Sequence, residues 1–216
     1  MHALLIGATG ATGKDLLNLL LTDDAFHQVD VFARQDPGLQ HEKLTVHVID
    51  FNIPEQWQHL VKGDVLFSCL GTTLKAAGSK EAQWKIDFDY QYNFAKAASQ
   101  NKVVRYVLVS ADFASPNSPF YYSKMKGQLE VAVKELKFPG LTIFKPPMLI
   151  RKNSDRTGEV IGLKLIKLFN KAGLLRSQKP LPTEVLAQAM INAAKKNATG
   201  SNTFKGKEIW KVAAAE

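Results

Sequence analysis

The stretch GATGATGKDLL at residues 7–17 limits what this chain can fold into more than any other feature. A phosphate-binding loop of a nucleoside triphosphatase needs glycine, four residues and then Gly-Lys-Ser/Thr, because the hydroxyl ligates magnesium. Here position 8 is Ala8, and Asp15 follows Lys14 where the hydroxyl should stand. The sequence therefore excludes that class of loop. What remains is a row of three evenly spaced glycines, namely Gly7, Gly10 and Gly13.

The elements around these glycines predict a dinucleotide-binding site. Such a site needs a strand before the loop, a helix after it and a second strand within about 30 residues. Residues 2–6 form an apolar run suited to a buried strand, 15–21 read as a helix, and 29–33 read as the next strand. Glycine-rich turns are common between strands and helices, so the three glycines alone are weak evidence. The flanking strands and helix make dinucleotide binding the favoured interpretation. The glycines permit a tight turn and close backbone approach, and the helix N-terminus meets the pyrophosphate.

The rest of the chain predicts an α/β fold. Further apolar runs at 44–49, 65–70, 103–110 and 141–145 read as strands, and a long helix is expected over 81–100. Strands that alternate with helices predict a doubly wound, Rossmann-like parallel sheet. We expect one domain over 1–216, with a dinucleotide-binding core at 1–150 and a small helical substrate region at 151–216. That region has a basic amphipathic stretch at 159–175 and a helix at 184–197.

Composition narrows the class of protein. The 216 residues are 45% hydrophobic and 22% charged, as in ordinary globular domains. We find no run of 18 or more apolar residues and no export signal, and we expect no membrane partner. The single cysteine, Cys69, fits a reducing cytoplasm, and the five histidines form no metal-ligand cluster. The net charge of +8 is spread along the chain without a nucleic-acid motif, so a small-molecule partner is expected instead of nucleic acid.

Three positions at predicted strand ends are candidate cofactor contacts. Arg34 ends the second strand, where an arginine suits the 2′-phosphate of NADP and an acid would suit NAD. The alternative is a surface arginine. Asp50 and Phe51 end the third strand, where they could meet an adenine, although Asp50 could equally be a turn residue. Residues 71–73 close the fourth strand at the same carboxyl edge, where ligands bind in open α/β sheets.

The segment YYSKMKGQLE carries the candidate catalytic residues. Tyr122 and Lys126 are four apart and so share one face of a helix, whereas Tyr121 pairs with Met125. A nearby ammonium favours the phenolate, so Tyr122 could exchange a proton with an alcohol or carbonyl. Ser110 ends the fifth strand, where its hydroxyl could hold the same substrate oxygen. A Tyr-x-x-x-Lys pair also occurs by chance in many helices, with the tyrosines as helix-start aromatics.

Taken together, these motifs resemble the atypical short-chain dehydrogenase/reductases, and among them the Tat-interacting-protein-like oxidoreductases. The resemblance covers nearly the whole chain and is strongest over residues 1–156. It rests on these segments: IGATGATG, SCLGTT, IDFDYQYNFAKAA, YVLVSAD, YSKMKGQLE and FKPPMLIRKNSDRTGE.

The resemblance implies a residue-by-residue cofactor site. Tyr122 and Lys126 would reach the nicotinamide ribose, and Arg34 the 2′-phosphate. The remaining contacts would be made by the glycine loop, the end of the fourth strand and the segment after the sixth: Gly7, Thr9, Gly10, Ala11, Thr12, Gly13, Leu70, Gly71, Thr72, Pro146, Met148 and Leu149. One departure is Asp87, which stands where many members of the superfamily have asparagine. That substitution questions a water-linked proton relay through this position.

We therefore expect an oxidoreductase of the short-chain dehydrogenase/reductase type that prefers NADP(H) to NAD(H). Hydride would pass between the nicotinamide and a small carbonyl or alcohol, with Tyr122 as acid/base, Lys126 tuning it and Ser110 orienting the oxygen. The alternative is an NADPH-binding regulatory or interaction protein with little turnover. We expect a cytoplasmic monomer or homodimer without a metal.

Overall fold

The computed structural model describes residues 1–150, 180–196 and 199–215. The stretch 159–175, for which the sequence predicts a basic amphipathic helix, lies outside these residues.

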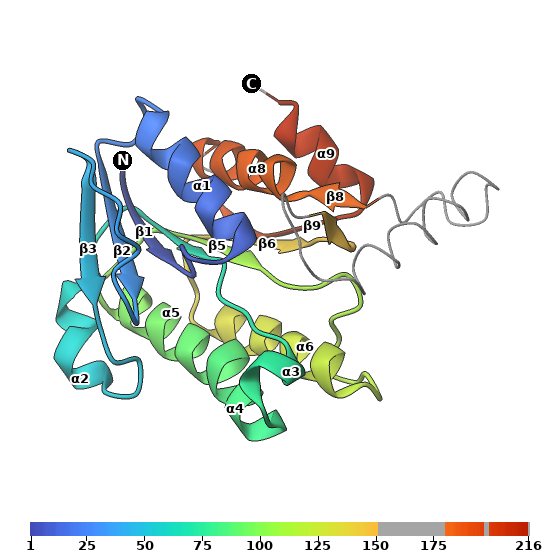
Figure 1. Ribbon diagram of the computed structural model, residues 1–216. Coiled ribbons are helices and arrows are strands. Elements are labelled where there is room, and N and C mark those ends of the chain that lie inside the picture. The colour runs from blue at the N-terminus through green and yellow to red at the C-terminus, as the bar shows by residue number, and fades with distance from the viewer. Residues whose placement is uncertain (151–179, 197–198, 216) are drawn as a thin grey trace.

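A parallel sheet of seven strands forms the centre of the molecule (Figure 1). Its order is β3-β2-β1-β4-β5-β6-β9, so the chain starts in the middle, winds to one edge, returns and winds to the other. This is the doubly wound Rossmann-like arrangement that the sequence predicts. A second sheet pairs two short strands, β7 with β8. The strands are β1 (His2–Ile6), β2 (Gln28–Ala33), β3 (Leu44–Val48), β4 (Val65–Ser68), β5 (Arg105–Val109), β6 (Gly140–Lys145), β7 (Leu149–Ile150), β8 (Leu181–Pro182) and β9 (Gly200–Lys205).

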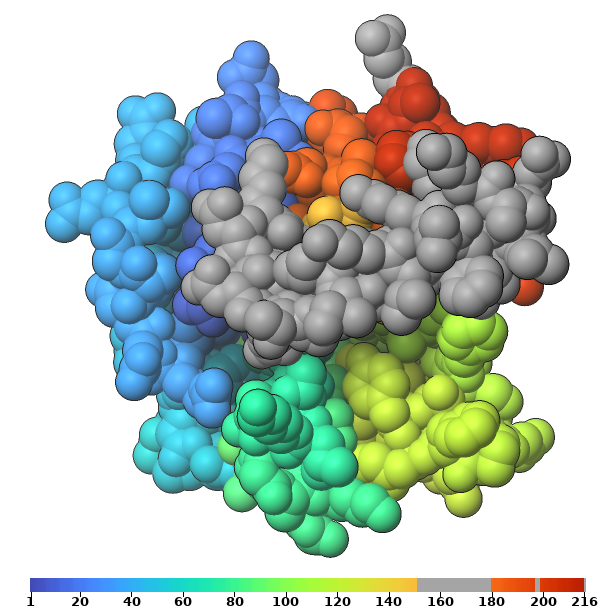
Figure 2. All heavy atoms as spheres, turned by 45° about the vertical axis from the view of Figure 1, so that its right-hand side comes forward, coloured from blue at the N-terminus to red at the C-terminus, as the bar shows by residue number. Residues whose placement is uncertain are grey.

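Helices cover both faces of the sheet, as Figure 1 shows. In Figure 2 the orange and red segments near the C-terminus lie above the green and yellow-green segments of the middle of the chain. One layer consists of α1 (Ala11–Thr22), α8 (Thr183–Lys195) and α9 (Lys207–Ala213). The other consists of α2 (Pro54–Trp57), α3 (Leu74–Ala77), α4 (Lys80–Trp84), α5 (Tyr90–Gln100) and α6 (Tyr121–Glu135). A 3₁₀ turn over Gln58–Leu60 follows α2, and a π-helical turn over Lys85–Asp89 joins α4 to α5.

Each face of the sheet has its own hydrophobic core. Strand residues such as Leu5 and Val31 pack with α1 and α8 on one side. Leu4 and Phe32, their neighbours along the strands, pack with α5 and α6 on the other. Successive side chains of a strand point to opposite faces, so strands buried on both sides are apolar throughout. This is why β1 and β2 appear in the sequence as continuous apolar runs.

Among the differences from the predicted elements, two concern the glycine loop and the edge of the sheet. α1 begins at Ala11 instead of residue 15, so the second half of the glycine stretch is already helical. The strand β9, which pairs with β6 at the sheet edge, was not predicted. Its sequence is GSNTFK, and most of its residues are exposed or half-buried, so it carries no apolar run to reveal it.

Candidate cofactor and substrate site

The glycine loop brings three pieces of backbone into close contact. Gly7 has φ +84°, a conformation that side chains disfavour, and a Cβ there would lie 2.5 Å from the backbone of Cys69 and Leu70. A Cβ on Gly13 would lie 2.0 Å from the carbonyl oxygen of Gly7. The loop therefore closes tightly against the end of β4 and the start of α1, and neither position has room for a side chain.

The loop leaves the N-terminus of α1 free to bind an anion. Gly10 is the residue before the helix, its amide donates to the Gly7 carbonyl, and it offers no side-chain cap. The amide of Lys14 makes the first intrahelical hydrogen bond, back to Gly10. The preceding amides of the first turn, at residues 11–13, have no carbonyl within the helix, and they lie at its positive end. Such a turn suits a pyrophosphate.

A cavity of 520 Å³ opens over this loop at the carboxyl ends of β1, β2 and β4. Eight predicted cofactor residues line it: Gly7, Thr9, Gly10, Arg34, Phe51, Leu70, Gly71 and Thr72. Ile86 in the π-helical turn and Tyr90 at the start of α5 also line it, and neither was predicted. Tyr90 stacks on Phe51 with ring centroids 5.2 Å apart. Only the amphipathic start of the helix predicted over 81–100 could have suggested these two residues.

The two charged residues predicted to contact the cofactor, Arg34 and Asp50, lie in different surroundings. Arg34 is exposed and lines the cavity, and no carboxylate among the described residues pairs with it. Asp50 is exposed outside the lining, and its Oδ1 accepts hydrogen bonds from the amide and side chain of Asn52, at 2.9 and 2.7 Å. Asp50 thus has the geometry of a turn residue, the alternative that the sequence left open.

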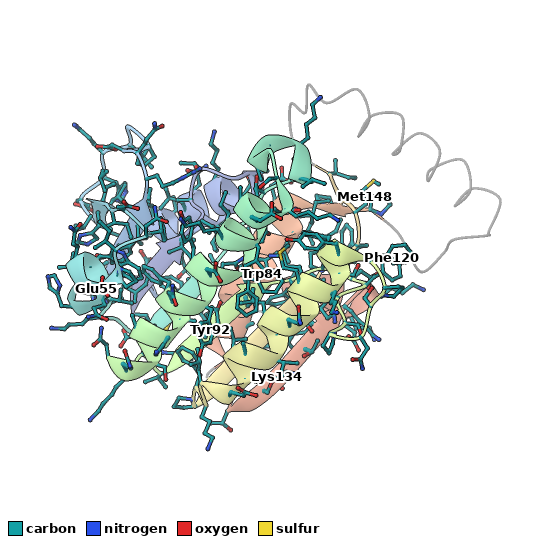
Figure 3. The ribbon with its side chains drawn as sticks, turned by 90° about the horizontal axis from the view of Figure 1, so that it is seen from below. Glu55, Trp84, Tyr92, Phe120, Lys134 and Met148 are labelled. Atoms are coloured by element: carbon teal, nitrogen blue, oxygen red, sulfur yellow. The ribbon has the colours of Figure 1, made fainter. Side chains whose placement is uncertain are left out.

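Tyr122 lies at a second, smaller cavity of 210 Å³. Most of its wall is apolar, with Pro146 and Met148 among the lining residues, and Ser123 and Asp112 add polar groups. Figure 3 shows Phe120 and Met148 at the same end of α6, the end that carries Tyr122. Of the predicted cofactor residues after β6, two therefore line this cavity. Leu149 lies in β7 and lines neither cavity.

The hydroxyl of Ser110 faces away from this second cavity. It is buried and donates to Glu130 Oε1 at 2.5 Å, while Glu130 Oε2 pairs with Lys145 at 3.1 Å. The next residue, Ala111, lines the cavity instead. Successive side chains along an extended segment point in opposite directions, so Ser110 points toward Glu130 on α6 while Ala111 points toward the cavity. The hydrogen bond to Glu130 competes with the predicted contact of Ser110 to a substrate oxygen.

Lys126 is buried behind Tyr122 and already has a partner. Its ammonium lies 3.1 Å from Asp87 Oδ1, with side-chain exposures of only 3% and 0%. Asp87 is the residue that departs from the asparagine of the resembled family. A buried ammonium needs such a counter-charge, because desolvation disfavours an unpaired one. Sequence spacing predicted the shared helix face of Tyr122 and Lys126, but not this ion pair.

Cys69 also lines the larger cavity, where the residue is half-buried. Burial raises the pKa of the Cys69 thiol to about 12, which keeps it protonated at neutral pH. Among the residues that the structure describes, no group of histidine, cysteine and carboxylate side chains could hold a metal ion. In the same residues, no helix is both long and apolar enough to cross a membrane.

The glycine cradle, the free amides of α1 and the aromatic wall fit a nicotinamide dinucleotide, and comparison with known proteins agrees. A family model described as NAD(P)H-binding matches residues 7–197. The chain belongs to this NAD(P)H-binding family. The predicted resemblance to Tat-interacting protein is confirmed by a curated relative. Protein HTATIP2 of Rattus norvegicus is 31% identical, over 87% of this chain and 78% of that protein.

A solved structure agrees on the fold, and curated relatives correct one prediction. The oxidoreductase ylbE from Lactococcus lactis has a TM-score of 0.73 at 18% identity, over 99% of this chain and 95% of that one. Protein FMP52-1, mitochondrial, of Scheffersomyces stipitis is 32% identical over 91% of this chain and 89% of its own length. The expectation of a cytoplasmic protein is wrong on this evidence, because this and other fungal relatives are named mitochondrial. A single cysteine excludes an internal disulfide but does not identify a compartment.

Proposed function

We propose that this protein is an NADP(H)-dependent oxidoreductase that interconverts a small carbonyl compound and its alcohol. The observation that carries the proposal is Tyr122, a partly exposed phenol on the wall of a small, largely apolar cavity. One helical turn further, at Lys126, lies a buried ammonium. The mitochondrial names of the fungal relatives support a mitochondrial location for this chain as well.

The residues of the larger cavity would hold the cofactor. The free amides of α1 would bind the pyrophosphate, Arg34 the 2′-phosphate, and Phe51 with Tyr90 an apolar ring face. A bound nicotinamide would supply or accept the hydride. The guanidinium of Arg34 is exposed and pairs with no carboxylate among the residues that the structure describes. This supports a preference for NADP(H), since a charge-assisted contact to a phosphate is worth more than a neutral one.

Tyr122 would move the proton. Its phenol would donate to the carbonyl oxygen during reduction and accept from the alcohol during oxidation. Lys126 lies one helical turn after Tyr122, and its charge is paired with Asp87. Ser110 would hold the substrate oxygen only if its hydroxyl turned from Glu130, so we give Tyr122 the larger role.

The substitution Tyr122→Phe tests this function, and Tyr121→Phe provides a matched control. Tyr121 precedes Tyr122 on the same helix, but its phenol donates to the carbonyl of Lys80 at 2.5 Å. Partial burial and the nearby Glu81 raise the pKa of Tyr121, which suits a phenol that keeps its proton. We expect Tyr122→Phe to lower kcat about 10²–10⁴-fold and to leave NADPH affinity nearly unchanged.

The Tyr121→Phe variant should keep most of its turnover. Rates are measured as NADPH consumption against a broad panel of carbonyl compounds. Near-parental turnover in Tyr122→Phe would remove Tyr122 from the site. A parent protein that binds NADPH but reduces nothing in the panel would favour the regulatory alternative.

A further inference from the structure

Asp87 is a fully buried carboxylate in the wall between the larger cavity and α6. It lies in the π-helical turn over Lys85–Asp89, within an otherwise α-helical stretch. A π-helical turn inserts one residue into a helix and so redirects the side chains around it, and such turns are frequent at functional sites. Here Ile86 and Tyr90 line the larger cavity, whereas Asp87 is closed off from solvent.

The two oxygens of Asp87 have different partners. Oδ2 accepts a hydrogen bond from the backbone amide of Thr72 at 2.9 Å. Oδ1 lies 3.1 Å from the ammonium of Lys126, and it accepts no other hydrogen bond among the described residues. Thr72 belongs to the loop that lines the larger cavity, and Lys126 lies one turn after Tyr122. One carboxylate therefore joins the cofactor loop to the helix that carries Tyr122.

The surrounding hydrogen bonds hold Asp87 in this place. The side chain of Gln91 donates to the carbonyl of Asp87 at 2.7 Å and accepts from the hydroxyl of Ser68 at 2.8 Å. The side chain of Gln83 donates to the carbonyl of Thr72 at 3.3 Å. The helical stretch is thus fixed to the end of β4, and Thr72 is bound through both its amide and its carbonyl.

Packing alone does not explain why a buried aspartate, Asp87, is paired with a buried lysine, Lys126. A buried ion pair usually adds little stability compared with a well-packed apolar pair, but it does fix orientation. We propose that Asp87 is a positioning residue that couples loop 70–72 of the dinucleotide cavity to the Tyr122-bearing helix through Lys126. A dinucleotide that orders loop 70–72 then also fixes the ammonium behind Tyr122, and the coupling acts equally in the reverse direction. This inference rests on the proposed function, because it assigns the loop to the cofactor.

The substitution Asp87→Asn separates the two contacts. An asparagine has one acceptor and one donor, so it can satisfy the Thr72 amide only by pointing its NH₂ group at the Lys126 ammonium. We expect NADPH to bind about five- to tenfold more weakly, measured by fluorescence titration well below the melting temperature. In a Lys126→Met background the donor–donor conflict is gone. There the same substitution should change the affinity less than twofold.

Glu130→Gln is the matched control. Glu130 is also a buried carboxylate, on α6, and it also pairs with a lysine at 3.1 Å, but its partners lie away from loop 70–72. A lost ion pair in the core should lower the melting temperature of this variant without weakening NADPH binding. A weakening that appears only for Asp87→Asn supports the proposal.

Several outcomes would overturn it. Unchanged NADPH affinity in Asp87→Asn, or an equal loss in both backgrounds, would reduce Asp87 to a structural residue while leaving the proposed function intact. A parent protein that bound neither NADPH nor NADH would overturn both. If Asp87→Asn does not fold, amide hydrogen exchange of Thr72 is compared between the parent and Lys126→Met. We expect at least a fivefold faster exchange in the variant, because the Asp87 carboxyl loses the partner that orients it, and unchanged exchange would contradict the coupling.

Discussion

At the scale of the residue, close contact with neighbouring backbone explains why glycine stands at two positions of the triplet, before any pyrophosphate of a cofactor is considered. Gly13 packs directly on the carbonyl of Gly7, and that contact exists without any ligand. Gly10 differs, since a Cβ there would meet nothing closer than 3.4 Å. The first and third glycines are therefore needed to form the loop, and the second lies open to the cavity.

This difference predicts unequal costs of substitution. Gly13→Ala should lower the free energy of unfolding by about 1–3 kcal/mol, because a methyl group must displace backbone. For a chain of this size that is a fall of roughly 2–4 °C in melting temperature per kcal/mol. Gly10→Ala, measured by the same thermal melt without cofactor, should lose much less. Equal melting temperatures for the two variants would show that the close packing of Gly13 does not matter.

Residue identity and spacing predicted part of the site. Gly7, Gly10, Arg34 and Phe51 line the larger cavity, as expected where strand ends of a parallel sheet meet at one edge, and their contacts to a cofactor stay a prediction. Ser110 and Asp50 illustrate what spacing misses, because each lies at the right position but turns its side chain toward a local partner. Glu130, 20 residues after Ser110, can be known as its partner only from the packed structure, whereas the turn at Asp50 was an alternative that the sequence left open.

At the scale of the element, α1 and α8 pack together over the sheet although nearly the whole chain separates them (Figure 1). Asp23, just after α1, bonds to Lys195 at the end of α8, with 2.8 Å between Oδ2 and Nζ. Partial burial opposes ionisation of Asp23. Hydrogen bonds from Lys195 and from the Ala25 amide outweigh that effect, so the pKa of Asp23 is lowered. The contact is therefore strongest with the carboxylate ionised.

A lowered pKa in the folded state makes this contribution dependent on pH. It is present above the pKa of an unfolded aspartate, about 3.9, and is lost as the pH falls through the lower folded value. Lys195→Met should lower stability by about 0.2–1 kcal/mol at pH 7, the range of exposed ion pairs. Urea unfolding at pH 7 and pH 2.5 measures the effect, with Lys196→Met as control. A deficit that persisted undiminished at pH 2.5 would assign the effect to packing.

Strands and helices with a clear pattern of apolar residues could be predicted from the sequence, and elements without such a pattern could not. The six predicted strands are all present, with ends shifted by one or two residues. β9 escaped because an edge strand with polar, exposed residues takes its structure from pairing with β6. The π-helical turn was not predicted either, because a single inserted residue within a long helical stretch is too short a feature to recognise from the spacing of apolar residues.

At the scale of the whole molecule, the fold places the predicted cofactor contacts and the Tyr122 cavity at the carboxyl edge of one sheet. The glycine loop and Arg34 follow the first two strands, and the Tyr122 cavity is built from segments after β5 and β6. Helices on both faces hold these loops in place, and Asp87 connects one group to the other. Sequence alone predicted the sheet and its edge, because alternating strands and helices allow few topologies.

The most direct test of the account is the affinity of the parent protein for NADPH and for NADH, measured by fluorescence titration. If Arg34 binds the 2′-phosphate, NADPH should bind about ten- to a hundredfold more tightly, since one charge-assisted contact contributes roughly 1.5–3 kcal/mol. Arg34→Ala should remove most of that difference and leave NADH affinity nearly unchanged. Equal affinities in the parent would contradict the assignment of Arg34, and the absence of binding by either dinucleotide would contradict the proposed function itself.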